Sequence, residues 1–113
     1  MITVKDKIFS GSAADTYVDL LNLPQTGIDR ITFKYICPDD SANSSTFRLL
    51  GYIAKDSENP DIIDETTIGV GEDKVVANGP TSTRYAIIAV QVKRTAEGSA
   101  SKYILEYNFS GKR

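Results

Sequence analysis

Residues branched at Cβ dominate the apolar part of this sequence and restrict what it can fold into. Isoleucine and valine together number 19 against six leucines, and threonine adds ten more. Branching at Cβ limits χ1 in a helix but packs well on a pleated sheet. Turn-forming residues interrupt the apolar stretches about every 8–14 residues, a spacing typical of an all-β fold.

The pattern predicts eight strands, at residues 2–9, 15–22, 28–37, 46–55, 62–70, 74–77, 84–94 and 101–109. Alternation is clearest where Ile31, Phe33 and Tyr35 share one face of a strand. Leu50 and Tyr52 give the strand at 46–55 a second apolar face. That strand is therefore expected at the centre of a sheet or at a subunit contact.

Two segments need a further interpretation. Residues 84–94 are apolar at nearly every central position, as in a strand covered on both faces. With residues 101–109 and the short loop between, they predict an antiparallel hairpin. In residues 12–22 the apolar spacing fits either a helix or a strand, and the strand-like neighbours favour a strand over 15–22.

These strands predict a single domain over residues 1–113, since 113 residues suit one domain. The expected architecture is an antiparallel β-sandwich of the jelly-roll kind, with a small closed β-barrel as the alternative. A parallel α/β fold is disfavoured, because no crossover helices are predicted between the strands.

The residues that most enzymes and metal sites use are scarce here. The sequence has no histidine, and its one cysteine, Cys37, lies on an apolar strand face. The missing histidine excludes His-based triads and His-ligated zinc. A single cysteine cannot form a disulfide within the chain, and an apolar strand face predicts a buried, inert thiol. We therefore expect no enzymatic activity, no cofactor and no metal site.

Carboxylates and tyrosines leave two further hypotheses open. The acidic residues cluster in polar loops, where solvated charge is the simpler interpretation and a small carboxylate-dependent hydrolase the sharper one. The six tyrosines fall in strand-like stretches, where they pack on sheets or, if exposed, form a platform for a glycan. The absence of tryptophan weakens the glycan hypothesis.

Charge is distributed unevenly along the chain. Residues 39–73 carry nine acidic and two basic residues, a net of −7, whereas residues 74–113 carry two acidic and seven basic residues, a net of +5. Either the two parts compensate each other within the fold, or they form a dipolar surface that pairs with a neighbouring molecule. The overall net charge of −2 argues against a dedicated nucleic-acid binder.

No stretch approaches the ~20 apolar residues that span a bilayer. Charged residues also occupy the place where an export signal has its apolar run. We therefore expect no membrane partner and a cytoplasmic location or, for a viral protein, a virion assembled in the host cytoplasm.

These features favour a non-enzymatic structural or assembly protein that binds copies of itself or a larger lattice. The specific hypothesis is an accessory virion protein of a tailed bacteriophage, a capsid decoration or head-stabilising protein that bridges major capsid or other virion proteins. A carbohydrate- or host-surface-binding β-sandwich module is the alternative. The candidate interface residues are Tyr52, Asp61, Asp64, Glu65, Arg84, Lys93, Arg94, Lys112 and Arg113.

Overall fold

The computed structural model describes residues 2–13, 16–24, 30–54, 56–78, 85–95 and 101–112. These residues form eight strands: β1 (Ile2–Ser12), β2 (Val18–Pro24), β3 (Arg30–Ile36), β4 (Ser45–Tyr52), β5 (Asp61–Ile68), β6 (Asp73–Asn78), β7 (Ile87–Arg94) and β8 (Lys102–Lys112). Each overlaps a predicted strand. Among the described residues, none forms a helix of the length and hydrophobicity that crossing a lipid bilayer requires.

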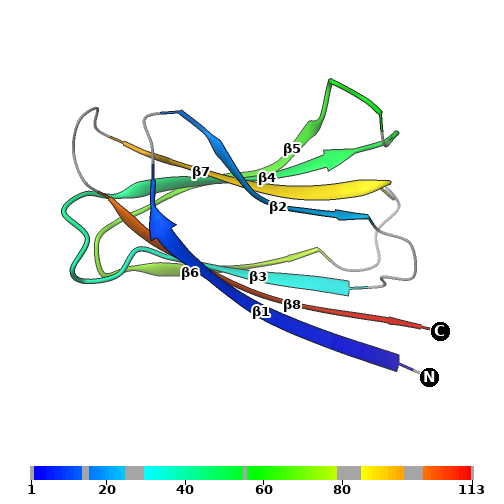
Figure 1. Ribbon diagram of the computed structural model, residues 1–113, viewed down its shortest axis with the longest axis horizontal. Coiled ribbons are helices and arrows are strands. Elements are labelled where there is room, and N and C mark those ends of the chain that lie inside the picture. Colours follow the sequence, from blue (N-terminus) through cyan, green and yellow to red (C-terminus); the bar gives the residue numbers. More distant parts are fainter. Residues whose placement is uncertain are drawn as a thin grey trace.

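The strands form two four-stranded antiparallel sheets that pack face to face (Figure 1). Sheet A has the order β1-β8-β3-β6, and sheet B has the order β2-β7-β4-β5. The pairs β1·β8, β2·β7, β3·β6 and β4·β5 are nested as in one long folded hairpin, and β3·β8 and β4·β7 join them. This nesting is the jelly-roll topology. The predicted β-sandwich is confirmed, and the closed barrel is not formed.

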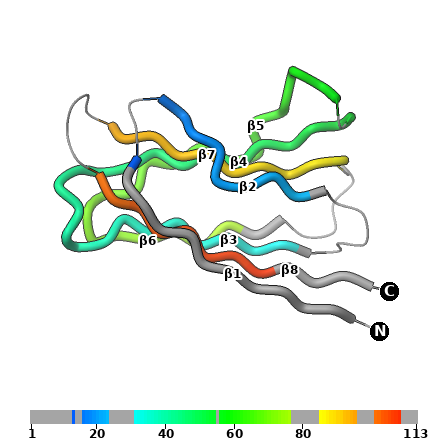
Figure 2. The backbone as a smooth tube through the Cα atoms, viewed as in Figure 1, coloured from blue at the N-terminus to red at the C-terminus, as the bar shows by residue number. Residues whose placement is uncertain are grey.

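The predicted hairpin between the last two strands is wrong. β7 lies in sheet B between β2 and β4, whereas β8 lies in sheet A between β1 and β3, and Figure 2 shows the two strands in different layers. Both strands are apolar and joined by a short connection, so the local sequence fits a hairpin and a crossing between layers equally. The pairing of β7 with β2 and β4, and of β8 with β1 and β3, places the two strands in different sheets.

Other predictions shift by a few residues. β1 continues past Gly11, because Ser12 still pairs with Lys102. β7 begins only at Ile87, after two residues outside the strand. β4 is a central strand, between β7 and β5, and its Leu50 is buried, which decides for the sheet centre over the subunit contact.

The ambiguous segment at 12–22 contains a strand, as favoured, and no helix in its described residues. β2 pairs with β7 from Val18 onward, and the register shifts between Asp19 and Leu21, which leaves Leu20 as an extra residue. This bulge explains the mixed pattern in the sequence, because one additional residue breaks the alternation of apolar positions.

Side chains from both sheets fill the space between them. The ring of Tyr35 on β3 stacks on Phe47 of β4, with centroids 4.7 Å apart and planes 4° from parallel. Tyr103 of β8 meets Phe47 edge-on, at 6.4 Å and 84°. Such aromatic pairs add about 0.5–1.5 kcal/mol beyond the apolar area that they bury. The fully buried apolar residues of the core between the sheets are Ile31, Phe33, Tyr35, Cys37, Phe47, Leu49, Ile88, Val90, Val92 and Leu105, which confirms the predicted face of β3.

A glycine closes the turn that carries the chain from sheet B to sheet A. Gly71 has a φ of 79°, and the amide of Glu72 donates to the carbonyl of Gly69 at 2.9 Å. The amide of Gly71 donates to the carbonyl of Cys37 at 2.8 Å, and the amide of Cys37 donates to the carbonyl of Glu72 at 3.1 Å. This is the pattern of a bulge that begins with a left-handed glycine.

Replacing this glycine tests the role of the turn. We expect Gly71→Ala to lower the free energy of unfolding by about 1–2 kcal/mol, because a left-handed conformation costs that much for a residue with a Cβ. The added Cβ would also lie 2.6 Å from Oδ1 of Asp39. Denaturant unfolding measures the change, with Val70→Ala at the exposed neighbouring position as the control. Equal stability of the Gly71→Ala variant and wild type would contradict this account.

Candidate interaction surfaces

Each sheet ends in two edge strands, which have a described partner strand on one side only. β1 and β6 border sheet A, and β2 and β5 border sheet B. The register of β2 shifts after Asp19, and that of β5 shifts opposite Leu49 and Leu50. Bulges of this kind protect an edge against further pairing. β1 and β6 instead keep an unbroken register with their neighbours, so sheet A has the less protected edges.

Three of the large apolar side chains exposed on the described surface lie on edge strands, each on a different one. Val18 lies on β2, Ile62 on β5 and Val75 on β6. Val70 lies in the turn between β5 and β6, and Ile53 directly follows β4. Ile62 and Val75 are 57% and 60% exposed. Edge strands of isolated proteins usually carry charge or proline, so an exposed apolar side chain on an edge strand is a candidate for contact with another molecule.

The outer face of sheet B carries a row of polar residues across all four strands. Asp19, Gln91, Arg48 and Glu65 lie directly opposite one another on β2, β7, β4 and β5. The Nε and Nη2 atoms of Arg48 donate to Oε1 of Gln91 at 3.0 and 2.5 Å. Gln91 in turn donates through Nε2 to Oδ1 of Asp19 at 2.7 Å. The side-chain amide of Gln91 therefore connects the guanidinium of Arg48 to the carboxylate of Asp19.

Tyr17 covers this row. Its ring centroid lies 3.8 Å from Cζ of Arg48 and 4.9 Å from Nζ of Lys93, and its hydroxyl donates to Oε2 of Glu65 at 2.8 Å. Burial raises the pKa of Tyr17 to about 12, with the hydrogen bond to Glu65 and its charge as further causes, against a lowering by Arg48. The polar groups of this face thus satisfy one another.

A second polar cluster closes the gap between the edge strands β5 and β6. Nζ of Lys74 lies 3.2 Å from Oδ1 of Asp64 and donates to Oγ1 of Thr66 at 2.8 Å. Thr66 also donates to Oδ2 of Asp64 at 3.0 Å. Burial, with the charge of Asp64 as the smaller cause, raises the pKa of Tyr35 far above its ordinary value. The ion pair thus joins the edge strand β5 of sheet B to the edge strand β6 of sheet A.

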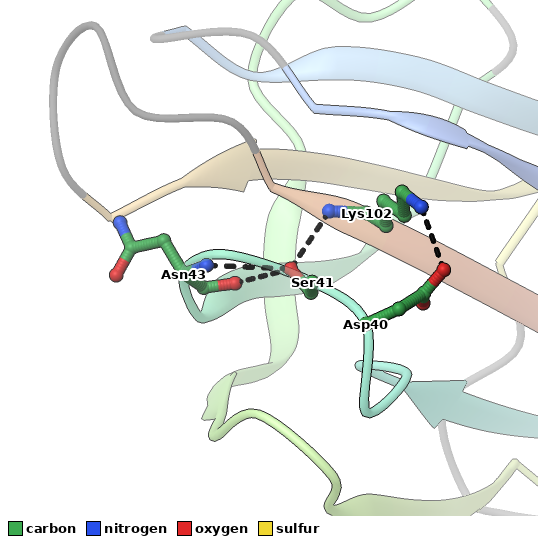
Figure 3. Close-up of polar contacts among 4 residues, drawn as sticks. All are labelled: Asp40, Ser41, Asn43 and Lys102. Atoms are coloured by element: carbon green, nitrogen blue, oxygen red, sulfur yellow. Dashed lines mark hydrogen bonds and ion pairs between the residues drawn. The ribbon is translucent and has the colours of Figure 1, made fainter.

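The loop between β3 and β4 is fastened to the start of β8 (Figure 3). Oγ of Ser41 accepts from the backbone amide of Lys102 at 2.9 Å and donates to the carbonyl of Asn43 at 2.6 Å. Nζ of Lys102 lies 2.6 Å from Oδ2 of Asp40, and this hydrogen bond and charge lower the pKa of Asp40. Behind them, the buried hydroxyls of Ser45 and Ser101 are hydrogen-bonded to each other.

The uneven charge of the sequence is partly compensated within the fold. Lys74 and Lys102 belong to the basic end of the chain, and their partners Asp64 and Asp40 belong to the acidic middle. These two contacts follow the first interpretation of the charge pattern. Both involve exposed groups, so each contributes little to stability.

The structure brings some predicted interface residues together and separates others. Glu65 and Lys93 meet at Tyr17, and Asp64 binds Lys74. Asp61 accepts a hydrogen bond from the hydroxyl of Tyr85 at 3.3 Å. The remaining candidates are Tyr52 and Arg94, which are half-buried at the ends of β4 and β7; Lys112, whose backbone alone is described; and Arg84 and Arg113, which lie outside the described residues.

Sequence reasoning missed the residues that organise the outer face of sheet B. Tyr17, Arg48 and Gln91 were not among the candidates, because they are far apart in the sequence and meet only through the strand register. Alternation in the strands predicts that Arg48 faces away from the core, since it lies between the buried residues Phe47 and Leu49. Nothing in the local sequence indicates its partners.

A metal site and a glycan platform gain no support from the described residues. No group of three or more histidine, cysteine, aspartate or glutamate residues among them is placed to hold a metal ion. None of the six tyrosines is exposed, and Tyr35, whose ring is parallel to a neighbour, is fully buried. A glycan platform needs aromatic faces that are open to solvent, and these tyrosines do not supply an evident one.

Comparison with known proteins gives a fold and no family. No family model matches the chain, and the search of the curated proteins found no match. A solved structure from Bacillus endospore appendages, described as a novel family of disulfide-linked pili, is similar to this chain with a TM-score of 0.62. The likeness covers 98% of this chain and 89% of the other at 8% sequence identity. At that identity it shows a shared fold.

The one cysteine of this sequence is placed inside the sandwich. Cys37 is 0% exposed, and its Sγ lies 3.5 Å from the carbonyl oxygen of Asn43. The predicted buried thiol is confirmed. In this conformation Cys37 cannot reach a cysteine of another molecule, because a disulfide requires Cα atoms within about 7 Å.

The tyrosine at the centre of the polar row has a testable titration. The difference in tyrosinate absorbance between wild type and Tyr17→Phe is expected to titrate near pH 12. Unfolded tyrosine ionises near pH ~10, so this group stabilises the fold fully below pH ~10 and loses that contribution as the pH rises toward 12. Titration of the difference near pH 10 would contradict both causes, since neither burial nor the hydrogen bond to Glu65 would then raise the pKa of Tyr17.

The buried thiol gives a second measurement. Native protein should react with a thiol reagent far more slowly than protein in denaturant, because only the unfolded chain exposes Cys37. Reaction at the same rate in both conditions would mean that Cys37 is accessible. A reductant should leave any assembly of the native protein unchanged, since no bond through Cys37 holds it.

Proposed function

We propose that this protein is a non-enzymatic structural subunit that assembles with copies of itself through the edges of its sandwich. The observation that carries the proposal is the position of the exposed apolar side chains. Val18, Ile62 and Val75 lie on edge strands, where the chain can also offer unpaired backbone groups. A surface that combines both kinds of group is suited to extension of a sheet by another molecule.

Two further observations support assembly through edges rather than through a sheet face. On the outer face of sheet B, the polar groups of Asp19, Gln91, Arg48, Glu65 and Tyr17 are already bonded to one another, so a partner gains little by contacting them. The fold is also shared with an appendage protein described as forming pili. The example of that other protein indicates that a sandwich of this kind can be the subunit of a polymer.

The finer hypothesis is an accessory virion protein of a tailed bacteriophage, a capsid decoration or head-stabilising protein. In that role the same edges would contact major capsid subunits as well as other copies of the chain. Binding to purified phage shells, measured by co-sedimentation, tests this form of the proposal separately from self-association. Co-sedimentation with the shell would support the virion hypothesis. Self-association without shell binding would contradict it and support a polymer of this chain alone.

Self-association is tested by mass as a function of concentration. Light scattering after size exclusion should show the mean mass rising with concentration for wild type. Ile62→Asp and Val75→Asp should each weaken association about tenfold, because burying a valine or isoleucine contributes about 1.5 kcal/mol or more. Asn108→Asp, an exposed change on the central strand β8, is the matched control and should associate like wild type.

The proposal fails if wild type stays monomeric over the whole concentration range and binds no shell. It also fails if Asn108→Asp weakens association as much as the edge variants, because net charge rather than the edges would then control assembly.

A further inference from the structure

The two edge strands whose register does not shift belong to the same sheet. β1 and β6 border sheet A, and their pairing is unbroken from Ile2 to Ser12 and, after the bulge at Gly71, from Asp73 to Asn78. Because sheet A consists of four strands that alternate in direction, β1 and β6 run antiparallel to each other. A copy placed beside sheet A in the same orientation therefore continues the alternation, with its β1 antiparallel to β6 of the first copy.

The hydrogen bonds near the turn at Gly71 show which backbone groups of β6 face outward. Both the amide and the carbonyl of Cys37 point toward residues 71–72. Backbone groups alternate in direction along a strand, so those of Tyr35 and Phe33 also point toward β6. The backbone groups of their partners on β6, Lys74 and Val76, in turn point toward β3. The amide and carbonyl of Val75, between them, face the open edge, as do those of its alternate neighbours.

The same argument applies to β1. The amide of Ala13 donates to the carbonyl of Ser101 at 2.8 Å, and the register continues without a break from Ser12 back to Ile2. Alternate residues from Gly11 backward therefore direct their backbone groups toward β8. Ser10, Ile8 and Asp6, between them, direct theirs toward the open edge. The pairing of β8 agrees with this assignment, because the alternate residues of β8 that do not bond β1 bond β3 instead.

We infer that β6 of one copy pairs antiparallel with β1 of the next, so that sheet A runs on from molecule to molecule in an open-ended chain. The inference rests on the proposed function and adds the partner strand. The two edges can pair without opposing like charges, because the apolar Val75 of β6 can lie opposite the apolar Ile8 of β1. A contact between two different edges repeats from copy to copy and gives an open chain unless its rotation closes a ring.

The sequence disfavours pairing of β1 with β1 of a second copy in the registers centred on its charged residues. A two-fold axis between identical antiparallel strands sets one residue opposite itself. Centred on Lys5, Asp6 or Lys7, such a pair places like charges opposite each other, which is destabilising. The heterologous pair avoids this when Val75 lies opposite Ile8 of the next copy. Lys74 then faces Phe9, and Val76 faces Lys7.

A proline at Val75 tests the open edge directly. Val75→Pro removes one outward amide and leaves the bonds to β3 in place, which is why proline is accepted in edge strands. We expect the mean mass of this variant to fall to that of the monomer at concentrations where wild type is assembled. Val75→Thr is the matched control, because it keeps the amide and the branched side chain and should weaken assembly only a few-fold. Assembly of Val75→Pro like wild type would overturn the inference.

Crosslinking identifies the partner strand without a destabilising substitution. Under mild oxidation, the double variant Ile8→Cys/Val75→Cys should form a ladder of disulfide-linked multimers, while Ile8→Cys and Val75→Cys alone remain uncrosslinked. Dimers from Val75→Cys alone would show that β6 pairs with β6, and no ladder from the double variant would exclude β1 as the partner. Wild type that never exceeds the monomer mass and binds no shell refutes the proposed function itself, whereas assembly that is unaffected by substitutions in β6 refutes only this pairing.

Discussion

Backbone hydrogen bonds between strands far apart in the sequence hold this sandwich together. β8 lies between β1 and β3 and bonds both, so the last strand of the chain joins the first strand to the rest of sheet A. β7 does the same for β2 and β4 in sheet B. The stacked pair Tyr35 and Phe47 can form only after both sheets have this order. Each layer thus depends on contacts that the local sequence does not contain.

The same hydrogen bonding determines which surfaces remain available. A central strand has its backbone groups paired on both sides, but each edge strand leaves one row unpaired. The structure treats its four edges differently. β2 and β5 are bulged, and Asp64 of β5 binds Lys74 across the gap between the sheets. β1 and β6 keep an unbroken register over Ile2–Ser12 and Asp73–Asn78, so extension by backbone pairing is best accommodated in sheet A.

The strands could be predicted from the sequence because the apolar pattern of each strand lies within a few consecutive residues. Alternation identified Ile31, Phe33 and Tyr35 as the buried face of β3, and the double apolar face of β4 indicated a central strand. The pairing of strands could not be predicted in this way. The supposed hairpin at 84–94 and 101–109 had suitable strands and a short loop, yet β7 and β8 belong to different sheets. Tyr17 and Arg48 were missed for the same reason, since the register of β2, β7 and β4 creates their contact.

A subunit of this kind would be held to its neighbours by reversible contacts. Cys37 is enclosed in the core, so the shared fold does not bring the disulfide linkage described for the endospore pili to this cysteine. Hydrogen bonds to an open edge and the burial of a few apolar side chains remain as the means of attachment. Each contributes about 1–2 kcal/mol, and ordering two molecules opposes them. Stability of an assembly would then depend on many copies in a row or on a lattice that fixes each copy in place.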